Sequence, residues 1–328
     1  MALLAYTDTT VLGILDVSSP FKPTLLCWLS PAQGGRFDQS SSRVIFWAGD
    51  KLGSADLATG KVVETDQLPA TPSKGAFSAD GKLFAYRVGD DNVGVSTHVH
   101  GIGYDRTLYT EEPIGGHGGP PYGPLDQLEF SADGTQLLDY YDFRPTSGPP
   151  KLLVFRTADW ASVFQSASAP AGGVWSRSGN TPYFFVWGPQ PPTGELDTLD
   201  TNGGPHTVAG SLNGFYWPRM QQDGGGIVYD TYDTAGQPHI WRLELATHAA
   251  SQLSTATGSL PVFVSPTIVW FNEEKPCDCG PGGLSAPDGV ILAYNFAVGG
   301  WTSVDMSQTA PGVGAPQPTT REVVDVLF

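Results

Sequence analysis

Positive charge is scarce in this sequence. Lysine and arginine together contribute 17 residues against 33 aspartates and glutamates, which gives a formal net charge of −16 at pH 7. A surface of this sign repels the phosphate backbone of nucleic acids and the headgroups of anionic lipids. We therefore expect no nucleic-acid partner.

Long apolar runs are missing as well. The longest, "LPVFVSPTIVWF", has 12 residues and is interrupted by Ser265 and Pro266, whereas a membrane-spanning helix needs about 20. The amino-terminal stretch "MALLAYTDTTVLGILDV" has its apolar run broken at Thr7 and no basic residue before Lys22, so it does not have the pattern of a secretory signal. We expect no membrane insertion. The compartment stays open between the cytoplasm and, if a signal has been removed, the periplasm or the extracellular space.

Cysteines and catalytic signatures are few. Cys27, Cys277 and Cys279 cannot form a closed set of disulfides, which leaves open free thiols, one disulfide to Cys27 or a soft-metal site at "CDC". The sequence contains no GxSxG elbow, no HExxH and no phosphate-binding glycine loop, so we expect no serine peptidase activity. The pair His98 and His100 lies on one face of an expected strand, but it lacks a third metal ligand nearby.

Glycine and proline, in contrast, are abundant. The 41 glycines and 28 prolines leave little room for long helices, because the first destabilises a helix interior and the second breaks it. The composition predicts an all-β fold.

A short motif recurs along the chain. The stretch "FSADG" begins at Phe77 and again at Phe130, and weaker copies follow at similar spacing. The aromatic or methionine anchors of the six copies are Phe37, Phe77, Phe130, Trp175, Met220 and Phe263. Successive anchors are 40, 53, 45, 45 and 43 residues apart, close to the length of about 40 to 45 residues of a four-stranded propeller blade. Each anchor precedes a tight turn rich in Ser, Asp and Gly, and a second hairpin follows in most copies, so each unit has four strands.

These units predict one seven-bladed β-propeller of four-stranded antiparallel blades over residues 1–328. Six anchors give six blades, and the first 30 residues hold three further strands that lack an inner strand. We expect "REVVDVLF" at the carboxyl end to supply it and to close the ring. Six blades are the alternative, if the first strands extend a neighbouring blade. The expected blades are 1–30 with 319–328, 31–70, 71–121, 122–168, 169–211, 212–258 and 259–310.

The units "FSADGKLFAY" and "FSADGTQLLDY", together with "ADLATGK", resemble the repeats of TolB-type propellers and of the propeller domains in prolyl oligopeptidase and dipeptidyl peptidase relatives. Blades 1, 5 and 7 depart from the pattern. The resemblance implies that turns such as "SADG" lie on the lower face of the ring. It places the loops between second and third strands on the upper face, together with the links between blades. Four long segments fall there: "DFRPTSGPPK", "WGPQPPTGE", "NEEKPCDCGPGGLSAPDG" and "PIGGHGGPPYGPLD". Long loops carry function in scaffolds of this kind, so we expect the upper face to be the working face.

Acidic and aromatic residues gather in the segments assigned to the upper face. Carboxylates attract cations or basic segments, and aromatic rings stack on sugars. Ordinary turn chemistry is the alternative for each aspartate. We expect a non-catalytic propeller that binds a small molecule, a carbohydrate or a peptide. The expected ligand-binding residues are His117, Tyr122, Tyr141, Asp142, Phe143, Trp187, Asp230, Tyr232, Asp233 and His239.

The second hypothesis is a metal-assisted hydrolase of esters, lactones or phosphoesters, with a divalent metal such as calcium in the central channel and His117 or an aspartate as base. The candidate ligands at the upper ends of the inner strands are Asp126, Glu129, Asn213 and Glu322. Calcium takes six to eight oxygen ligands, and Arg36, Lys74 and Arg219 occupy similar strand positions. The resulting cage is sparse.

Overall fold

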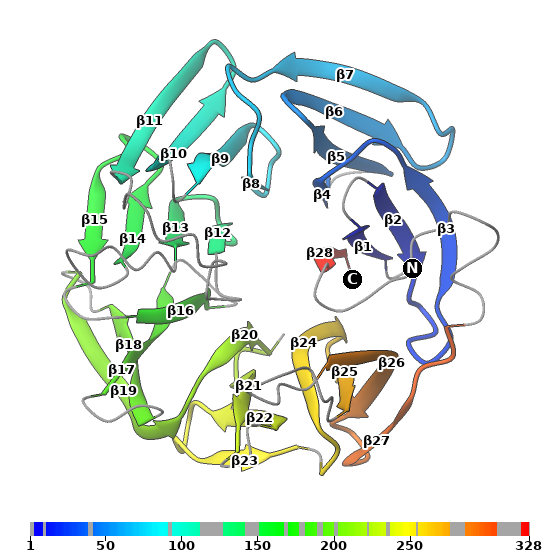
Figure 1. Ribbon diagram of the computed structural model, residues 1–328, viewed down its shortest axis with the longest axis vertical. Helices are drawn as coiled ribbons and strands as arrows, with labels where there is room; N and C mark the ends of the chain where they lie inside the picture. Colours follow the sequence, from blue (N-terminus) through cyan, green and yellow to red (C-terminus); the bar gives the residue numbers. More distant parts are fainter. Residues whose placement is uncertain are drawn as a thin grey trace.

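The computed structural model is a closed ring of seven four-stranded antiparallel sheets, as the repeat predicted (Figure 1). It describes residues 3–8, 11–38, 42–90, 94–111, 127–141, 151–166, 170–176, 181–188, 193–199, 203–221, 223–233, 237–253, 255–275, 286–306 and 323–327. Every regular element within these ranges is a strand, and they contain no helix suited to crossing a membrane. The six-bladed alternative is excluded.

The four strands of each blade follow one another from the axis of the ring outward. Blade 1 contains β28 (Val323–Leu327), β1 (Leu3–Asp8), β2 (Val11–Asp16) and β3 (Thr24–Leu29). Blade 2 contains β4 (Gly34–Phe37), β5 (Arg43–Ala48), β6 (Lys51–Asp56) and β7 (Val62–Gln67). Blade 3 contains β8 (Lys74–Phe77), β9 (Leu83–Asp90), β10 (Gly94–Gly101) and β11 (Tyr104–Glu111). Blade 4 contains β12 (Gln127–Phe130), β13 (Gln136–Tyr141), β14 (Lys151–Arg156) and β15 (Ser162–Gln165).

The remaining three blades have the same order. Blade 5 contains β16 (Pro170–Trp175), β17 (Pro182–Trp187), β18 (Thr193–Leu199) and β19 (Pro205–Asn213). Blade 6 contains β20 (Tyr216–Met220), β21 (Gly226–Tyr232), β22 (Pro238–Glu244) and β23 (Ala250–Gln252). Blade 7 contains β24 (Gly258–Ser265), β25 (Ile268–Lys275), β26 (Ala286–Asn295) and β27 (Gly300–Ser303). The expected long loop after Phe271 is therefore shorter than predicted, because β25 and β26 extend into it.

The two ends of the chain meet in blade 1. Strand β28 pairs antiparallel with β1, with Leu327 opposite Leu3 and Val326 opposite Leu4. The carboxyl-terminal strand thus completes the one blade that lacked an inner strand. The predicted closure of the ring is confirmed.

The two copies of "FSADG" fold into the same turn. Ser78 donates a hydrogen bond from its hydroxyl to Asp80 Oδ1 at 2.8 Å, and the corresponding distance from Ser131 to Asp133 is 2.7 Å. The glycine that follows has a positive φ, 69° at Gly81 and 70° at Gly134, a conformation that glycine adopts without steric cost. The repeated residues therefore encode the hairpin that joins the inner strand to the second strand.

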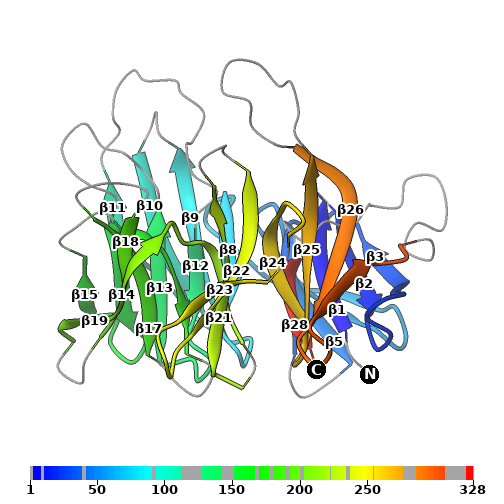
Figure 2. The same cartoon turned by 90° about the horizontal axis from the view of Figure 1, so that it is seen from below.

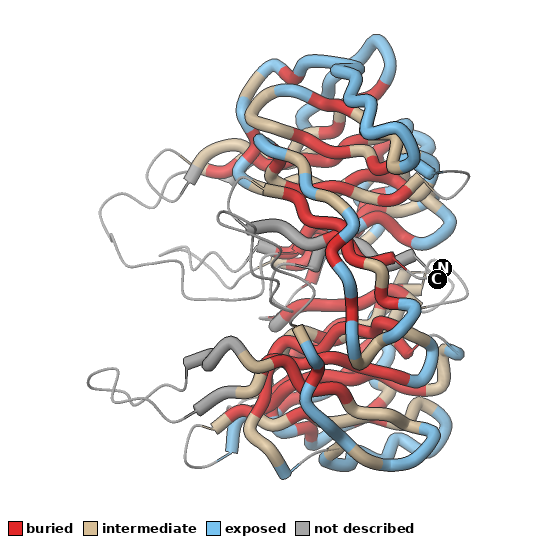
Figure 3. Tube along the Cα trace, turned by 90° about the vertical axis from the view of Figure 1, so that its right-hand side faces the viewer, coloured by how far each residue is buried: buried red, intermediate tan, exposed pale blue. Residues whose placement is uncertain are grey.

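The hydrophobic core lies between neighbouring blades. Figure 3 shows buried residues along the middle strands and exposed residues at the rim; all six residues of β7 are exposed, whereas those of β21 are buried except the last. Trp47 of blade 2 packs against Phe77 and Phe84 of blade 3, at ring-centroid distances of 6.1 and 5.3 Å. The anchors Phe77, Phe130 and Trp175 are 6%, 3% and 5% exposed, which confirms their predicted burial.

Polar side chains also connect the blades. Arg87 of β9 and Asp139 of β13 form an ion pair across blades 3 and 4, with side-chain exposures of 1% and 4%. Trp175 donates its indole N–H to the Glu129 carbonyl of blade 4 at 3.1 Å. Trp270 of blade 7 donates in the same way to the carbonyl of Pro20 at 2.8 Å. The blades are thus joined by specific bonds as well as by apolar packing.

Candidate functional site

We call the edge of the ring at which the second strand of each blade ends the upper face, and the edge that carries the "SADG" turns the lower face. Figure 2 shows the ring from the side, with the strands running roughly along its axis. Several predicted residues lie outside the described part of the chain: His117, Tyr122, Asp142, Phe143, Asp126, Glu322, Cys277 and Cys279. Tyr141 ends β13, and its side chain is also outside the description.

Three aromatic residues form a row on the upper face of blades 5 and 6. Trp187 is the last residue of β17, Tyr216 the first of β20 and Tyr232 the last of β21. The ring centroids of Trp187 and Tyr216 are 5.7 Å apart, and those of Tyr216 and Tyr232 are 5.3 Å apart with nearly perpendicular planes. Tyr232 is 36% exposed and the other two are partly buried. The row therefore joins two blades and remains open to solvent.

Phe185 supports the first member of this row. Its ring meets that of Trp187 edge to face at a centroid distance of 5.0 Å, and Phe185 itself is completely buried. An aromatic side chain held from beneath loses little conformational entropy when a ligand covers it. Trp187 is thus a pre-oriented contact surface.

Polar side chains flank the row on blade 6. His239 of β22 lies with Nε2 at 3.3 Å from Asp233 Oδ2 and with Nδ1 at 3.2 Å from the Gln252 side-chain nitrogen. Asp233 also accepts a hydrogen bond from the Gln237 backbone at 2.9 Å. Of the described ligand-binding candidates, Trp187 and Tyr232 are therefore joined through Tyr216, and Asp233, the residue after Tyr232, pairs with His239.

Tyr216 was not predicted. It begins an inner strand, whereas the aromatic residues of the site were expected where a second strand ends or in loops. Its position beside a β-bulge in the β20–β21 pairing brings its ring to the upper face. The cluster "FYW" at an expected blade boundary was the signal available.

Two other candidates lie elsewhere than expected. Asp230 is completely buried, and its Oδ2 accepts a hydrogen bond from the Leu260 backbone N–H at 2.9 Å, which connects blade 6 to blade 7. Asn213 was expected on an inner strand, but it ends the outermost strand of blade 5 and pairs with Thr193. The placement of Asn213 corrects the expected boundary between blades 5 and 6. Because Asp230 is buried, we leave it out of the ligand surface.

Glu129 does lie on an inner strand, β12, and is exposed. Since Asp126 and Glu322 are outside the described residues, the predicted calcium cage stays a prediction. Among the residues that are described, no group of three or more His, Cys, Asp or Glu side chains is arranged to hold a metal ion. Cys27 forms no disulfide with any described residue, and burial raises the pKa of its thiol.

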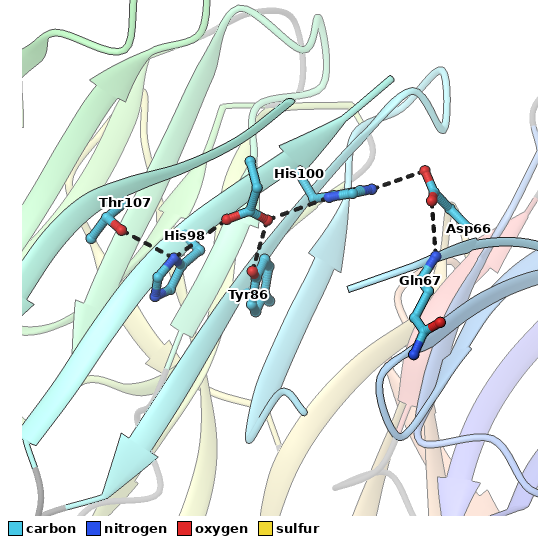
Figure 4. A network of polar contacts seen from close by, with 7 residues as sticks. Asp66, Gln67, Tyr86, His98, His100 and Thr107 are labelled. Carbon is cyan, nitrogen blue, oxygen red and sulfur yellow. Dashed lines mark hydrogen bonds and ion pairs between the residues drawn. The ribbon is translucent and has the colours of Figure 1, made fainter. Parts of the chain in front are cut away.

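The histidine pair of β10 lies in a polar network near the lower face (Figure 4). His100 has Nδ1 at 3.3 Å from Asp105 and Nε2 at 3.0 Å from Asp66 of blade 2. His98 Nδ1 is 3.7 Å from the other Asp105 oxygen, and the Tyr86 hydroxyl donates to Asp105 at 2.8 Å. The hydrogen bond from His100 lowers the pKa of Asp66, and burial together with Asp105 raises the pKa of Tyr86. Neither carboxylate was predicted, because Asp66 comes from β7 and Asp105 from β11.

Comparison with known proteins gives further evidence for the propeller fold. No protein-family model and no curated protein matches the sequence. Among solved structures, the tricorn protease has 11% identity and a TM-score of 0.64, over 92% of this chain and 33% of that chain. A prolyl endopeptidase has 11% identity and a TM-score of 0.58, over 92% and 49%. An oligogalacturonate lyase in complex with manganese has 14% identity and a TM-score of 0.57, over 95% and 86%.

This chain thus spans about a third of the tricorn protease chain and about half of the prolyl endopeptidase chain. TolB from Acinetobacter baumannii and the dipeptidyl peptidase 4 of Porphyromonas gingivalis match as well. At identities this low a likeness carries the fold and no function. The chain is a seven-bladed β-propeller, with the fold that the resemblance of its repeats to the propellers of prolyl and dipeptidyl peptidases implied.

Proposed function

We propose that this protein is a ligand-binding propeller whose ligand lies on the upper face of blades 5 and 6. The observation that carries the proposal is the aromatic row of Trp187, Tyr216 and Tyr232, which crosses a blade boundary and is flanked by Asp233 and His239. Rigid aromatic surfaces with a few polar groups beside them are typical of binding sites for sugars and peptides.

The expected ligand is a carbohydrate or a peptide with a flat or apolar face and a hydrogen-bonding or cationic group. The rings would cover the flat face by stacking. The carboxylate of Asp233, which is held by His239 and the Gln237 backbone, would receive the polar group. No catalytic role is assigned to any of these side chains.

An oligosaccharide array and a library of short peptides test the proposal. A ligand found in either screen should bind at least about fivefold more weakly to Trp187→Ala and to Tyr232→Ala, because loss of a central aromatic contact reduces the binding free energy by more than about 1 kcal/mol. Trp301→Ala is the matched control, since Trp301 is a 45% exposed tryptophan on β27 of another blade. Undiminished binding in both row variants would refute this location.

The second hypothesis, a metal-assisted hydrolase that uses His117, stays a prediction. A relative in fold, the oligogalacturonate lyase, was solved with manganese, which makes the metal content of this protein worth measuring. Elemental analysis of protein purified without added metal, combined with an assay on a chromogenic ester, separates the two functions. A stoichiometric divalent ion whose removal abolishes ester cleavage would favour the hydrolase.

A further inference from the structure

The aromatic row on blades 5 and 6 is not a flat surface. The ring planes of Trp187 and Tyr216 are inclined by 55°, and those of Tyr216 and Tyr232 by 81°. A chain of sugar rings that stacks on several aromatic side chains needs their faces to be nearly parallel, and this row lacks that arrangement. Steeply inclined rings instead turn their electron-rich faces in different directions around a small cation. The geometry of the row therefore favours a cationic group over an extended saccharide.

His239 orients the Asp233 carboxylate at the end of this row. The side-chain nitrogen of Gln252 lies 3.2 Å from His239 Nδ1, and His239 Nε2 lies 3.3 Å from Asp233 Oδ2. An amide nitrogen only donates, so Nδ1 accepts and the ring carries its proton on Nε2, which donates to the carboxylate. These bonds are complete with a neutral imidazole. His239 thus positions the carboxylate without cancelling its charge.

Gln237 contributes a second acceptor beside this carboxylate. Its backbone N–H donates to Asp233 Oδ1 at 2.9 Å, and the backbone N–H of Asp233 donates to the Gln237 carbonyl at the same distance. Within the described part of the chain, the side-chain oxygen Oε1 of Gln237 is buried and has no hydrogen-bond partner. A buried acceptor without a donor destabilises the fold, and an N–H group of a ligand would satisfy it.

Acidic residues occupy similar positions in other blades. Strands β1 and β9 end at Asp8 and Asp90, and Asp50 lies in the turn after β5. Each of these strands is the second of its blade and ends on the upper face, as β21 does just before Asp233. In a chain of net charge −16, such a face attracts cations and speeds their association.

A guanidinium group matches these features together. It is planar and always charged, it stacks on aromatic faces, and its five N–H donors suit carboxylate and amide oxygens. We propose that the aromatic row binds an arginine side chain of a peptide, with the guanidinium against the rings and its N–H groups donating to Asp233 and to Gln237 Oε1. This inference rests on the proposed function and names the ligand class of the same site.

Two matched peptides test the inference on the whole, unchanged chain. One is N-acetyl-Gly-Arg-Gly-amide, and the other contains citrulline, which has nearly the shape of arginine but no charge. In isothermal titration calorimetry at low ionic strength, the arginine peptide should bind at least about tenfold more tightly, because only its hydrogen bonds to the carboxylate are formed by two charged groups. Equal affinities, or no binding of the arginine peptide, would overturn the inference.

A pair of variants separates a specific site from general attraction to an acidic face. Asp233→Asn keeps an acceptor for the Gln237 backbone and removes the charge, so it should weaken the arginine peptide about tenfold or more. Asp50→Asn is the matched control, since Asp50 follows the second strand of blade 2 and also accepts from a glutamine side chain, that of Gln67 at 2.9 Å. It should change the affinity by less than about twofold. Equal losses in both variants would contradict the assignment.

The location of the bound peptide distinguishes this inference from the proposed function. In protein labelled with ¹⁵N-tryptophan, the indole signal of Trp187, assigned by its loss in Trp187→Phe, should shift when the arginine peptide is added, and that of Trp301 should not. If an oligosaccharide depends on Trp187 while the arginine peptide leaves its signal unmoved, the binding site stands and its assignment to arginine is wrong. If no probe of either kind depends on Trp187, the proposed function fails as well.

Discussion

Replacing Asp139 by asparagine should destabilise the ring strongly at the contact of blades 3 and 4. The change keeps the shape of the side chain and removes the negative charge that Asp139 holds beside the buried Arg87 guanidinium. Arg87 Nε lies 3.1 Å from Asp139 Oδ1, and Nη2 donates to the carbonyls of Gln127 at 2.7 Å and Tyr140 at 2.9 Å. The arginine is therefore fixed in place and cannot turn outward to solvent.

The expected loss of stability is about 3 to 5 kcal/mol, the usual result of removing one partner of a buried ion pair. The pair lies within the range for buried pairs because its side chains are only 1% and 4% exposed, so water cannot replace the lost charge. An unfolding entropy of about 2.1 cal/mol/K per residue gives about 0.7 kcal/mol/K for a chain of this length, so the melting temperature should fall by about 4 to 7 °C.

Differential scanning calorimetry at pH 7 measures this change. Arg87→Leu combined with Asp139→Leu should recover most of the loss, since it removes both charges together, although two carbonyls lose their donor. Arg156→Met is the control, because the Arg156–Asp159 pair on blade 4 is about half exposed and exposed pairs contribute little. A melting temperature of Asp139→Asn within about 1 °C of the unchanged protein, or a double variant as unstable as the single, would refute the reasoning.

Three further predictions concern closure, charge and packing. Deleting residues 321–328 should lower the melting temperature sharply, because β1 loses its partner β28; calorimetry that finds no change would contradict the observed closure. Lys74→Met should be more stable than the unchanged protein below pH 8. This difference in stability should shrink between pH 8 and 10.5, because only the unfolded chain keeps the lysine proton there. Urea midpoints whose difference stays constant over this range would refute this prediction. Trp175→Ala should cost about 3 to 5 kcal/mol in urea unfolding, whereas Trp301→Ala on the exposed rim should cost far less, and equal losses would contradict the burial of the anchor.

The fold could be predicted because its signal is local and repeated. Ser78, Asp80 and Gly81 specify their turn through bonds among themselves. The same residues recur at Ser131, Asp133 and Gly134, and weaker copies mark the other blades. The closing strand was found because three strands in the first 30 residues needed a fourth. Asn213 was misplaced because the boundary between blades 5 and 6 was set before it. Strand β19 continues through Asn213 and is followed by Gly214, which has a φ of 69°.

The site could be predicted only in part. Trp187 and Tyr232 were identifiable because each ends a second strand, and every second strand ends on the same face. Tyr216 and Asp66 were missed, since each reaches a partner in a neighbouring blade: Tyr216 meets Trp187 of blade 5, and Asp66 meets His100 of blade 3.

The pairing of β28 with β1 also determines when the ring can close during protein synthesis. Strand β1 is synthesised before the other strands of the ring, and its partner β28 is separated from it by about 300 residues. A ribosome adds these residues in roughly 15 to 60 s at about 5 to 20 residues per second. For that time blade 1 has three strands and an open inner edge, and any neighbouring nascent chain carries a strand that fits it. When many ribosomes translate one mRNA at close spacing, exchange of β28 between copies of the protein is therefore favoured. The yield of closed monomer should rise when the ribosomes are farther apart on the mRNA.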